Sequence, residues 1–420
     1  MHVVLLTQYY PPETGAPQNR LSSLAIRLQR LGHEVTVLTA MPHYPVGRVY
    51  PGYRWKLFAK EVRDGVPVYR AWVFATPSKS VPLRLLNFLS FAVSCLVAGV
   101  FCLRRVDALI VETPPLFTAI SGWMLARLKR AKFVVNVADL WVKAARHMGV
   151  VRNRGLIGAA AAVEARLYRG ADLVTVQTRG IADDVRLTAP GARVYLLTNG
   201  VDPLRFSPDF GQPELLDTFG LRGKFIVGYA GIHGIVQRLD RVIEAGHLLR
   251  ECPDVVLAFF GDGPTKPELE ARAHAAGLDN VRFFPLQPAG EMPKIIPSWG
   301  AALVPLPDSF VGATALPSKM FEAMAAGVPL LLTAPEGEAS EMIRAAKCGL
   351  CVAAENPQAV ADGIKALYAD RRTATELGMN GRVHVLEHFN RDTIARAFSL
   401  ELESLAAAAT PAAALEGERS

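Results

Sequence analysis

The segment 313–332, ATALPSKMFEAMAAGVPLLL, constrains the fold of this chain most strongly. Pro317 and Ser318 predict a helix start, because proline fixes the backbone before a helix and serine is a favoured N-cap. Strong helix formers follow, and Gly327 with Pro329 predicts the end of the helix. The apolar run after them is typical of a parallel strand that is covered on both faces. The segment therefore predicts an α/β unit whose strand lies in the core.

The same helix is expected to carry a binding site in its first turns. A helix N-terminus exposes unpaired N–H groups and a partial positive charge, so it can hold an anion. Lys319 adds a full charge there, and Glu322 lies one turn further along, where a carboxylate can accept hydrogen bonds from a ribose diol. The alternative is an ordinary α/β unit in which these two residues are incidental.

The rest of the chain repeats the alternation of apolar strands and helices, which predicts two Rossmann-like, doubly wound α/β domains with parallel sheets facing a central cleft. A turn-rich segment at 198–208, TNGVDPLRFSP, predicts the boundary. We expect a first domain at 1–200 and a second at 201–380. C-terminal helices at 381–405 are expected to pack back towards the first domain, and an alanine-rich tail at 406–420 is expected to be disordered.

The charge of the chain is divided unevenly between its halves. The net charge is +7, but residues 1–200 hold 26 Lys and Arg against 11 Asp and Glu, whereas residues 201–420 hold 20 against 28. A basic half suggests an anionic partner, such as a phosphate-bearing substrate or a membrane surface. No nucleic-acid-binding motif is visible in it, so we expect no nucleic-acid partner.

An apolar segment at 81–105 has two interpretations. Phe88–Leu103 contains no charged residue over 16 positions, which is fewer than the roughly 20 that a spanning helix needs. One interpretation is a buried or half-buried helix of the first domain. The other is a helix that lies in the surface of a membrane, with Arg104 and Arg105 at the level of the headgroups.

The five cysteines and the first residues of the chain indicate the cellular compartment in which the protein is expected to occur. Cys348 and Cys351 have the spacing of a metal-binding pair, but no second pair completes a zinc site. We expect all five to be buried thiols in a reducing compartment. The chain opens with MHVVLLT, which lacks the basic region of a signal peptide. A cytoplasmic location is therefore expected.

Candidate residues of the first domain follow an expected strand at 133–137. Ligands of open α/β sheets lie at the carboxyl ends of the strands, so Asp139 is expected to face a cleft, with Trp141 as a stacking surface or wall. The alternative role for Asp139 is that of a helix N-cap.

Several motifs together resemble family 4 of the glycosyltransferases, which are retaining enzymes of the GT-B fold. These motifs are QYYPPETGAPQNR, TPP, DLW, NGVD, GDGP and PSKMFE, and the resemblance runs from about residue 1 to residue 400. The sequence is most similar to the bacterial subgroup that builds O-antigen, capsule and related surface polysaccharides such as lipopolysaccharide.

The resemblance implies a donor site in the second domain. Glu322 matches the second glutamate of the family's E-x7-E pattern and would bind the ribose of a nucleotide sugar, whereas Thr314 stands at the first glutamate. Lys319 and Arg238 would stabilise the diphosphate. The other implied donor-binding residues are Gly15, Gly231, His233, Gly261, Gly263, Thr314, Ala315 and Leu316.

The resemblance also implies the reaction and its acceptor. Asp139 matches the family's D-L-W position and would orient or deprotonate the acceptor, beside Trp141 and with Arg104 and Arg105 as acceptor or membrane contacts. We expect transfer of a sugar, such as an acetamido sugar, from a UDP-linked donor to a lipid-linked or glycan acceptor at the inner face of the cytoplasmic membrane. No acidic pair of the DxD type occupies a cleft position, so neither a metal nor another cofactor is expected. The alternatives are an epimerase of the same fold and a non-catalytic nucleotide-sugar-binding protein.

Overall fold

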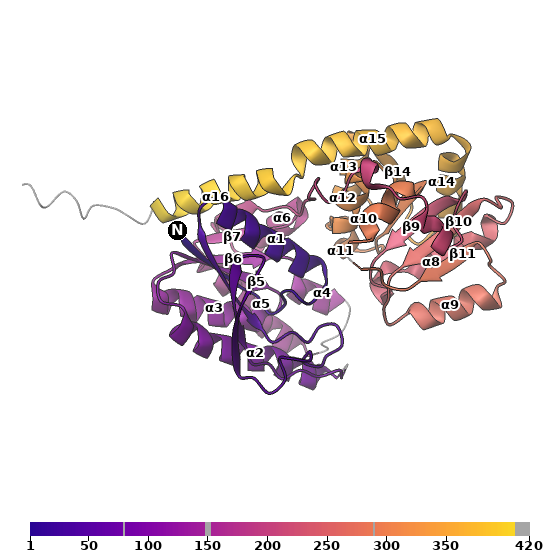
Figure 1. Cartoon of the computed structure of the whole chain (residues 1–420). Helices are drawn as coiled ribbons and strands as arrows, with labels where there is room; N and C mark the ends of the chain where they lie inside the picture. Colours follow the sequence, from indigo (N-terminus) through magenta and orange to yellow (C-terminus); the bar gives the residue numbers. More distant parts are fainter. Residues whose placement is uncertain (79, 148–152, 289, 408–420) are drawn as a thin grey trace, which may run out of the picture. The chain divides into compact units, whose positions relative to one another are not determined.

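The computed structural model describes residues 1–78, 80–147, 153–288 and 290–407 (Figure 1). Of the tail expected to be disordered, residues 406 and 407 form the end of helix α16, and the rest lies outside the described residues.

The chain divides into two compact units. Unit 1 consists of Met1–Thr198 and Arg391–Ser420, and unit 2 is Asn199–Asn390. The chain thus returns to unit 1 at residue 391, immediately after helix α15 of unit 2. The sequence analysis placed the corresponding change at residue 381.

Unit 1 is built on an eight-stranded sheet in the order β3-β4-β2-β1-β5-β6-β7-β8. Neighbouring strands are parallel except for β3 and β4, which form an antiparallel pair at one edge. The strands are β1 (His2–Leu6), β2 (Glu34–Ala40), β3 (Phe58–Arg63), β4 (Val66–Ala71), β5 (Ala108–Thr113), β6 (Lys132–Val137), β7 (Leu173–Val176) and β8 (Val194–Leu196).

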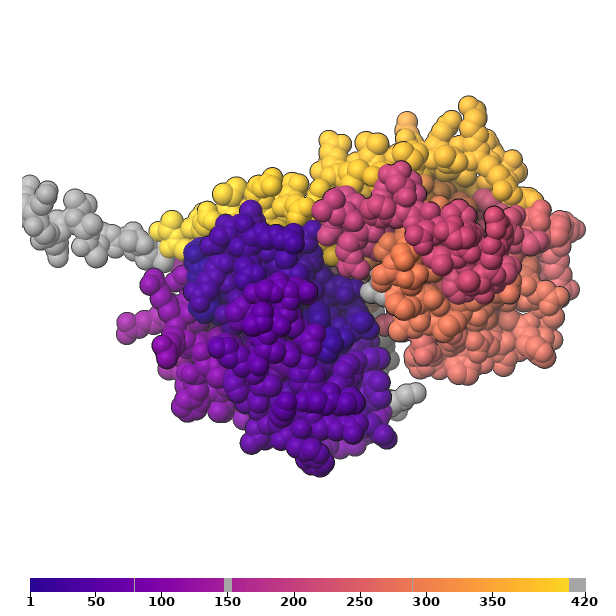
Figure 2. Space-filling model, in the orientation of Figure 1, coloured from indigo at the N-terminus to yellow at the C-terminus, as the bar shows by residue number. Residues whose placement is uncertain are grey.

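Helices cover both faces of this sheet. On one face α1 and α16 pack together, and Leu28 and Phe398 join strand residues such as Ile110 in one buried cluster. Side chains alternate between the faces of a strand, so Val111, which contacts Gly122 of α3, belongs to the other face, where α2 and α3 lie. Figure 2 shows α16, in yellow, along the surface of unit 1. The helices are α1 (Ala16–Arg30), α2 (Val81–Cys102), α3 (Leu116–Lys129), α4 (Trp141–His147), α5 (Arg154–Arg169), α6 (Arg179–Thr188) and α16 (Arg391–Ala407).

Unit 2 is built on a six-stranded, wholly parallel sheet in the order β11-β10-β9-β12-β13-β14. Consecutive residues of its strands alternate between two hydrophobic clusters: Phe225 and Val227 belong to one, and Ile226 to the other. This alternation requires both faces to be buried. The strands are β9 (Phe225–Ala230), β10 (Val255–Phe260), β11 (Val281–Phe284), β12 (Ala301–Pro305), β13 (Leu330–Thr333) and β14 (Gly349–Val352).

The helices of unit 2 complete the two layers. Residues of α8, α9 and α14 line one cluster, and residues of α12, α13 and α15 line the other. The α-helices are α7 (Leu215–Thr218), α8 (Leu239–Leu248), α9 (Lys266–Ala275), α10 (Met292–Ile295), α11 (Phe310–Ala313), α12 (Ser318–Ala325), α13 (Glu338–Ala346), α14 (Pro357–Ala369) and α15 (Arg371–His388), and the 3-10 helices are η1 (Pro208–Phe210), η2 (Ile235–Gln237) and η3 (Ile296–Ser298).

The strand order of unit 2 reverses direction between β9 and β12, which is where open α/β sheets bind ligands. The two strands pair only at Ala301 with Val227 and at Ala302 with Gly228. Beyond these pairs the ladder stops, although β9 continues to Ala230 and β12 to Pro305. The carboxyl ends of β9 and β12 therefore frame an opening in the sheet.

Candidate active site

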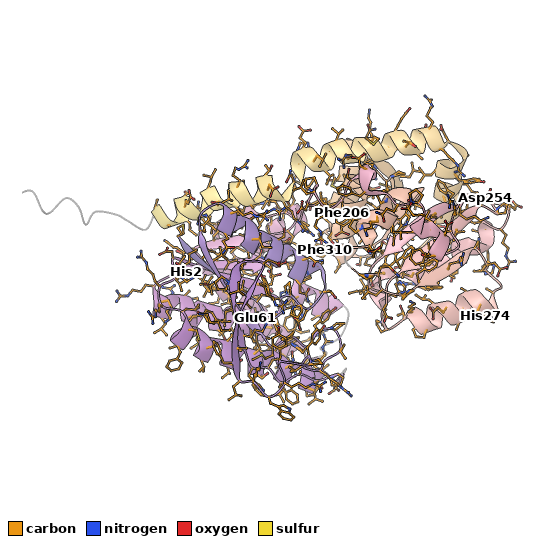
Figure 3. All side chains as sticks on the ribbon, in the orientation of Figure 1. His2, Glu61, Phe206, Asp254, His274 and Phe310 are labelled. Atoms are coloured by element: carbon orange, nitrogen blue, oxygen red, sulfur yellow. The ribbon has the colours of Figure 1, made fainter. Side chains whose placement is uncertain are left out.

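Helix α12 supplies the two charged side chains nearest to this opening. Lys319 and Glu322 line one small cavity together with residues of β9 and β12. Phe310, which Figure 3 labels, marks α11 in the loop that leads from β12 to this helix. The helix begins at Ser318 with Pro317 as N-cap, so the serine expected to cap it is its first residue, and no side chain caps this end. The Met320 N–H donates to the Pro317 carbonyl oxygen (3.1 Å), and within the described part of the chain the N–H groups of Ser318 and Lys319 are left for another acceptor.

Lys319 is the cation that the structure places at the opening. Its Nζ lies 3.8 Å from the ring centroid of Tyr229, and a Cβ at Gly231 would lie 3.1 Å from it. Burial lowers the pKa of Lys319 to about 7, because the ammonium loses its hydration, while the nearby Glu322 carboxylate opposes the shift. An amine held in this way gains its full charge when an anion binds beside it.

The glycines of the turns after β9 and β10 have a packing role that spacing alone does not show. A side chain at Gly261 would collide with the carbonyl oxygen of Gly231, and one at Gly263 would collide with that of His233. The two turns are also joined by a hydrogen bond from the His233 N–H to the Asp262 carbonyl oxygen (2.9 Å). The predicted glycines Gly231, Gly261 and Gly263 therefore come together and let two backbones touch.

His233 is a predicted donor-binding residue, and its side chain is packed away from solvent. Its side chain is fully buried and meets the rings of Tyr229 and Phe283 at centroid distances of 5.8 and 6.0 Å. Burial, with a contribution from Lys266, lowers the pKa of His233 to about 4. The imidazole is thus neutral near pH 7, and the role of His233 in donor binding stays a prediction.

The Arg238 side chain already forms ion pairs with two carboxylates. Its guanidinium contacts Glu355 (2.5 Å) and Asp240 (3.3 Å). Two opposite charges neutralise it, which is a poor arrangement for a diphosphate ligand. A diphosphate would compete with these carboxylates for Arg238, whose role at the diphosphate stays a prediction, and Glu355, which follows β14, is the partner that spacing could not reveal.

The loop before α12 uses part of its backbone internally. Thr314 donates its N–H and its hydroxyl to the Phe310 carbonyl oxygen, at 3.1 and 3.0 Å, and Ala315 donates its N–H to Gly312 at 3.4 Å. Within the described part of the chain the N–H of Leu316 has no such partner. Of the three predicted donor-binding residues in this loop, Leu316 is the one whose N–H is left for a ligand.

In unit 1, Gly15 is the N-cap of α1, and a Cβ there would lie 2.5 Å from the Gln18 amide oxygen. The Gln18 side chain thus packs directly over Gly15. The loop around it is held by Glu13, which the sequence analysis missed. The buried Glu13 carboxylate accepts hydrogen bonds from the N–H groups of Tyr10 (3.1 Å), His43 (2.7 Å) and Tyr44 (2.8 Å). Burial raises the pKa of Glu13 to about 7, against these hydrogen bonds.

Asp139 follows β6 and is exposed, and Trp141 is the half-buried first residue of α4. Within the described residues the Asp139 side chain makes no capping hydrogen bond, so the N-cap interpretation is wrong. Nearby lies a buried row that spacing did not reveal: Arg20 pairs with Glu112 (2.5 Å), which in turn accepts a hydrogen bond from Asn136 (2.5 Å). Loss of hydration of the carboxyl raises the pKa of Asp139, and the charge of Arg20 opposes this shift.

Arg104 and Arg105 precede β5 and lie at the amino ends of the strands, opposite the carboxyl end that Asp139 follows. Both are exposed, and the Arg105 carbonyl oxygen contacts the ring of His2, the first residue of β1. Asp139 follows the carboxyl end of β6, which is parallel to β1 through β5. The two arginines therefore lie away from Asp139 within unit 1, and their role as acceptor or membrane contacts stays a prediction.

Helix α2 is partly buried against the sheet, as expected for a half-buried helix of the first domain. It is 22 residues long and contains an 18-residue stretch with a mean hydropathy of 2.2, which by length and composition is enough to cross a membrane, but part of it packs on the sheet. A stripe with helical spacing faces outward: Leu86, Leu89, Val93, Val97 and Phe101 are 43–82% exposed. Among the described residues, no group of three or more His, Cys, Asp or Glu side chains is placed to hold a metal.

Comparison with known proteins identifies two family models in the chain. Residues 15–200 match the model "Glycosyl transferase 4-like domain", and residues 217–384 match "Glycosyl transferases group 1". A curated relative, the putative colanic acid biosynthesis glycosyl transferase WcaI of Escherichia coli K12, is 29% identical over 380 residues, which cover 87% of this chain and 91% of the relative.

Solved structures share the fold. A sucrose-phosphate synthase from Thermosynechococcus elongatus superposes with a TM-score of 0.75 at 18% identity, covering 97% of this chain and 99% of the other. Anabaena HepE in complex with UDP-glucose gives a TM-score of 0.71 at 16% identity, covering 96% and 100%. The two family models together account for most of the chain, and with two parallel-sheet units of the GT-B type it belongs to the family 4 glycosyltransferases.

Proposed function

We propose that this protein is a retaining glycosyltransferase that moves a sugar from a UDP-linked donor to a lipid-linked or glycan acceptor in the synthesis of a bacterial surface polysaccharide. The observation that carries the proposal is the pair Lys319 and Glu322, one turn apart on α12 at the opening between β9 and β12. The name of the WcaI relative supports a role in polysaccharide synthesis, and the UDP-glucose complex of HepE supports the donor class. The transferred group is proposed to be an acetamido sugar.

In this proposal unit 2 binds the donor. The Glu322 carboxylate accepts hydrogen bonds from the ribose hydroxyls, and Lys319 with the first-turn N–H groups of α12 binds the diphosphate. The loops at Gly261 and Gly263 support the base. As the bond between the anomeric carbon and the β-phosphate oxygen breaks, negative charge grows on the phosphate, and the fixed dipoles and the ammonium stabilise it. We propose that these groups suffice without a metal.

Unit 1 binds the acceptor. Asp139 orients the acceptor hydroxyl, or takes its proton, beside Trp141. The new bond forms between the acceptor oxygen and the anomeric carbon on the face that the phosphate leaves. The hydroxyl proton passes to the departing phosphate oxygen, or to Asp139. The configuration of the sugar is thereby retained, and no covalent sugar–protein intermediate is needed.

A release assay tests this function. The purified protein is incubated with UDP-, GDP- and ADP-sugars, with and without a lipid extract, and the released nucleoside diphosphate is measured. We expect release that depends on one donor and on an acceptor, and its loss in Glu322→Ala and in Lys319→Ala. The matched controls are Glu341→Ala on α13 and Lys365→Ala on α14. Full activity in either site variant would refute the assignment.

We also propose that the outward stripe of α2 lies in the surface of the cytoplasmic membrane, where lipid-linked acceptors are found. Exposed apolar side chains on α3, Met124 and Leu128, adjoin α2, and the exposed Arg84, Arg104 and Arg105 flank its ends. Apolar area and basic charge together favour an anionic bilayer.

Vesicle flotation tests the membrane contact. The protein should float with phosphatidylglycerol vesicles at low salt and should be released by high salt. Phe101→Asp should abolish flotation, whereas Leu187→Asp, at an equally exposed position on α6, should not. Failure of the natural protein to float with anionic vesicles at low salt would contradict this part of the proposal.

A further inference from the structure

A small cavity lies at the split between β9 and β12, lined by Lys319 and Glu322. It has about 10 Å³ of space for the centres of water molecules, which is close to what one water needs. Most of its wall is apolar, and its polar lining side chains are Lys319, Glu322 and Trp299. These side chains supply two kinds of donor and one acceptor, and a buried water usually makes about three hydrogen bonds.

Trp299 is fixed firmly beside this cavity. The side chain is 6% exposed and its ring stacks on Phe260 with centroids 5.9 Å apart. It fills the space over Gly228, where any side chain would collide with the indole. The indole N–H has no hydrogen-bond partner among the described residues. Buried indole N–H groups are normally paired, so a partner is needed in the cavity that the indole lines.

We propose that Trp299 is a positioning residue for the ribose of the donor and acts through one water in this cavity. The water accepts hydrogen bonds from the Trp299 N–H and the Lys319 ammonium and donates one to Glu322. The hydrogen bond from this water fixes the orientation of the Glu322 carboxylate. Its remaining lone pairs then point towards the ribose hydroxyls. This inference rests on the proposed function, because it takes Glu322 as the ribose ligand.

The test replaces the indole N–H without changing the shape of the side chain. A variant carries 3-benzothienyl-alanine, in which sulfur takes the place of the N–H, at position 299. Titration calorimetry measures the binding of UDP and of 2′-deoxy-UDP to this variant and to the natural protein. A second variant, Phe260→Leu, disturbs the packing beside the indole but keeps its N–H.

We expect the natural protein to prefer UDP over 2′-deoxy-UDP by about tenfold, the usual effect of a hydrogen bond to a charged group. In the benzothienyl variant this preference should fall to about threefold or less, chiefly through weaker binding of UDP. Phe260→Leu should change the binding of both nucleotides by a similar factor and keep the preference.

An unchanged preference in the benzothienyl variant, or an equal loss for both nucleotides, would overturn the inference and leave the proposed function intact. Failure of the natural protein to bind UDP and 2′-deoxy-UDP, and equally GDP and 2′-deoxy-GDP, would refute the proposed donor site and this inference with it.

Discussion

Lys319 should take up a proton when a nucleoside diphosphate binds. In the free protein its pKa is about 7, because burial disfavours the ammonium. A diphosphate beside it favours the ammonium, so the pKa of Lys319 should rise towards or above its ordinary value of 10.5. Below pH 7 the amine is protonated in both states and its charge adds no pH dependence. Above pH 7 binding must first protonate it, so the affinity falls as the pH rises.

These pKa values fix the size of the effect. Between pH 7.0 and 8.5 the affinity for UDP should fall about 15-fold, and at pH 8 about 0.9 proton should be taken up for each UDP bound. The phosphate of UDP titrates near pH 6, below this range, so it contributes little. Titration calorimetry in buffers of different ionisation enthalpy measures both quantities.

The control for this experiment is Lys319→Arg, because a guanidinium stays charged throughout the range. If that variant folds, which its melting temperature reports, its affinity for UDP should be independent of pH from 7.0 to 8.5. A flat affinity in the natural protein, together with binding heats that do not depend on the buffer, would refute the claim that a desolvated Lys319 meets the diphosphate.

Three further predictions concern other residues. Gly263→Ala should lower the melting temperature by about 3–8 °C and weaken UDP binding, because its Cβ meets the His233 backbone; Gly290→Ala, with nothing within 4 Å of the new Cβ, should do neither. Asp139→Asn should reduce kcat by about 10²-fold or more while leaving the Kd for UDP unchanged; an equal loss in both would contradict a role on the acceptor side. Glu13→Gln should cost about 1–3 kcal/mol of stability in urea unfolding, because its amide N–H₂ would face backbone N–H donors; an unchanged midpoint would show that these hydrogen bonds are not stabilising.

Much of the fold could be predicted, because buried parallel strands are continuous apolar runs and the helices between them have clear starts and ends. The edges of the sheets were harder. Strand β3 is exposed on one side and carries Lys60 and Glu61, so it lacks an apolar run, although the Asp64-Gly65 turn that joins it to β4 is a known hairpin signal. Strand β14 is only four residues long and half-buried.

Some residues of the candidate site could likewise be predicted from the sequence, and others could not. Lys319 and Glu322 could be found because both lie on one predicted helix, where spacing fixes their separation. The pairing of Arg238 with Glu355 could not be found, since these residues are 117 positions apart and meet only when β9 and β14 join one sheet. Glu13 and Glu112 were missed for a related reason. Glu112 lies in β5, and its partners Arg20 and Asn136 belong to α1 and β6, while two of the three N–H groups that bind Glu13 come from residues 43 and 44. A lone glutamate in the sequence carries no signal of such distant partners.

A crystal structure of the protein with UDP tests the central claim most directly. We expect the ribose hydroxyls within about 3 Å of the Glu322 carboxylate, and the diphosphate against Lys319 and the first-turn N–H groups of α12. A nucleotide bound away from the opening between β9 and β12, or a diphosphate that takes Arg238 from Glu355 and leaves Lys319 without a contact, would contradict the account.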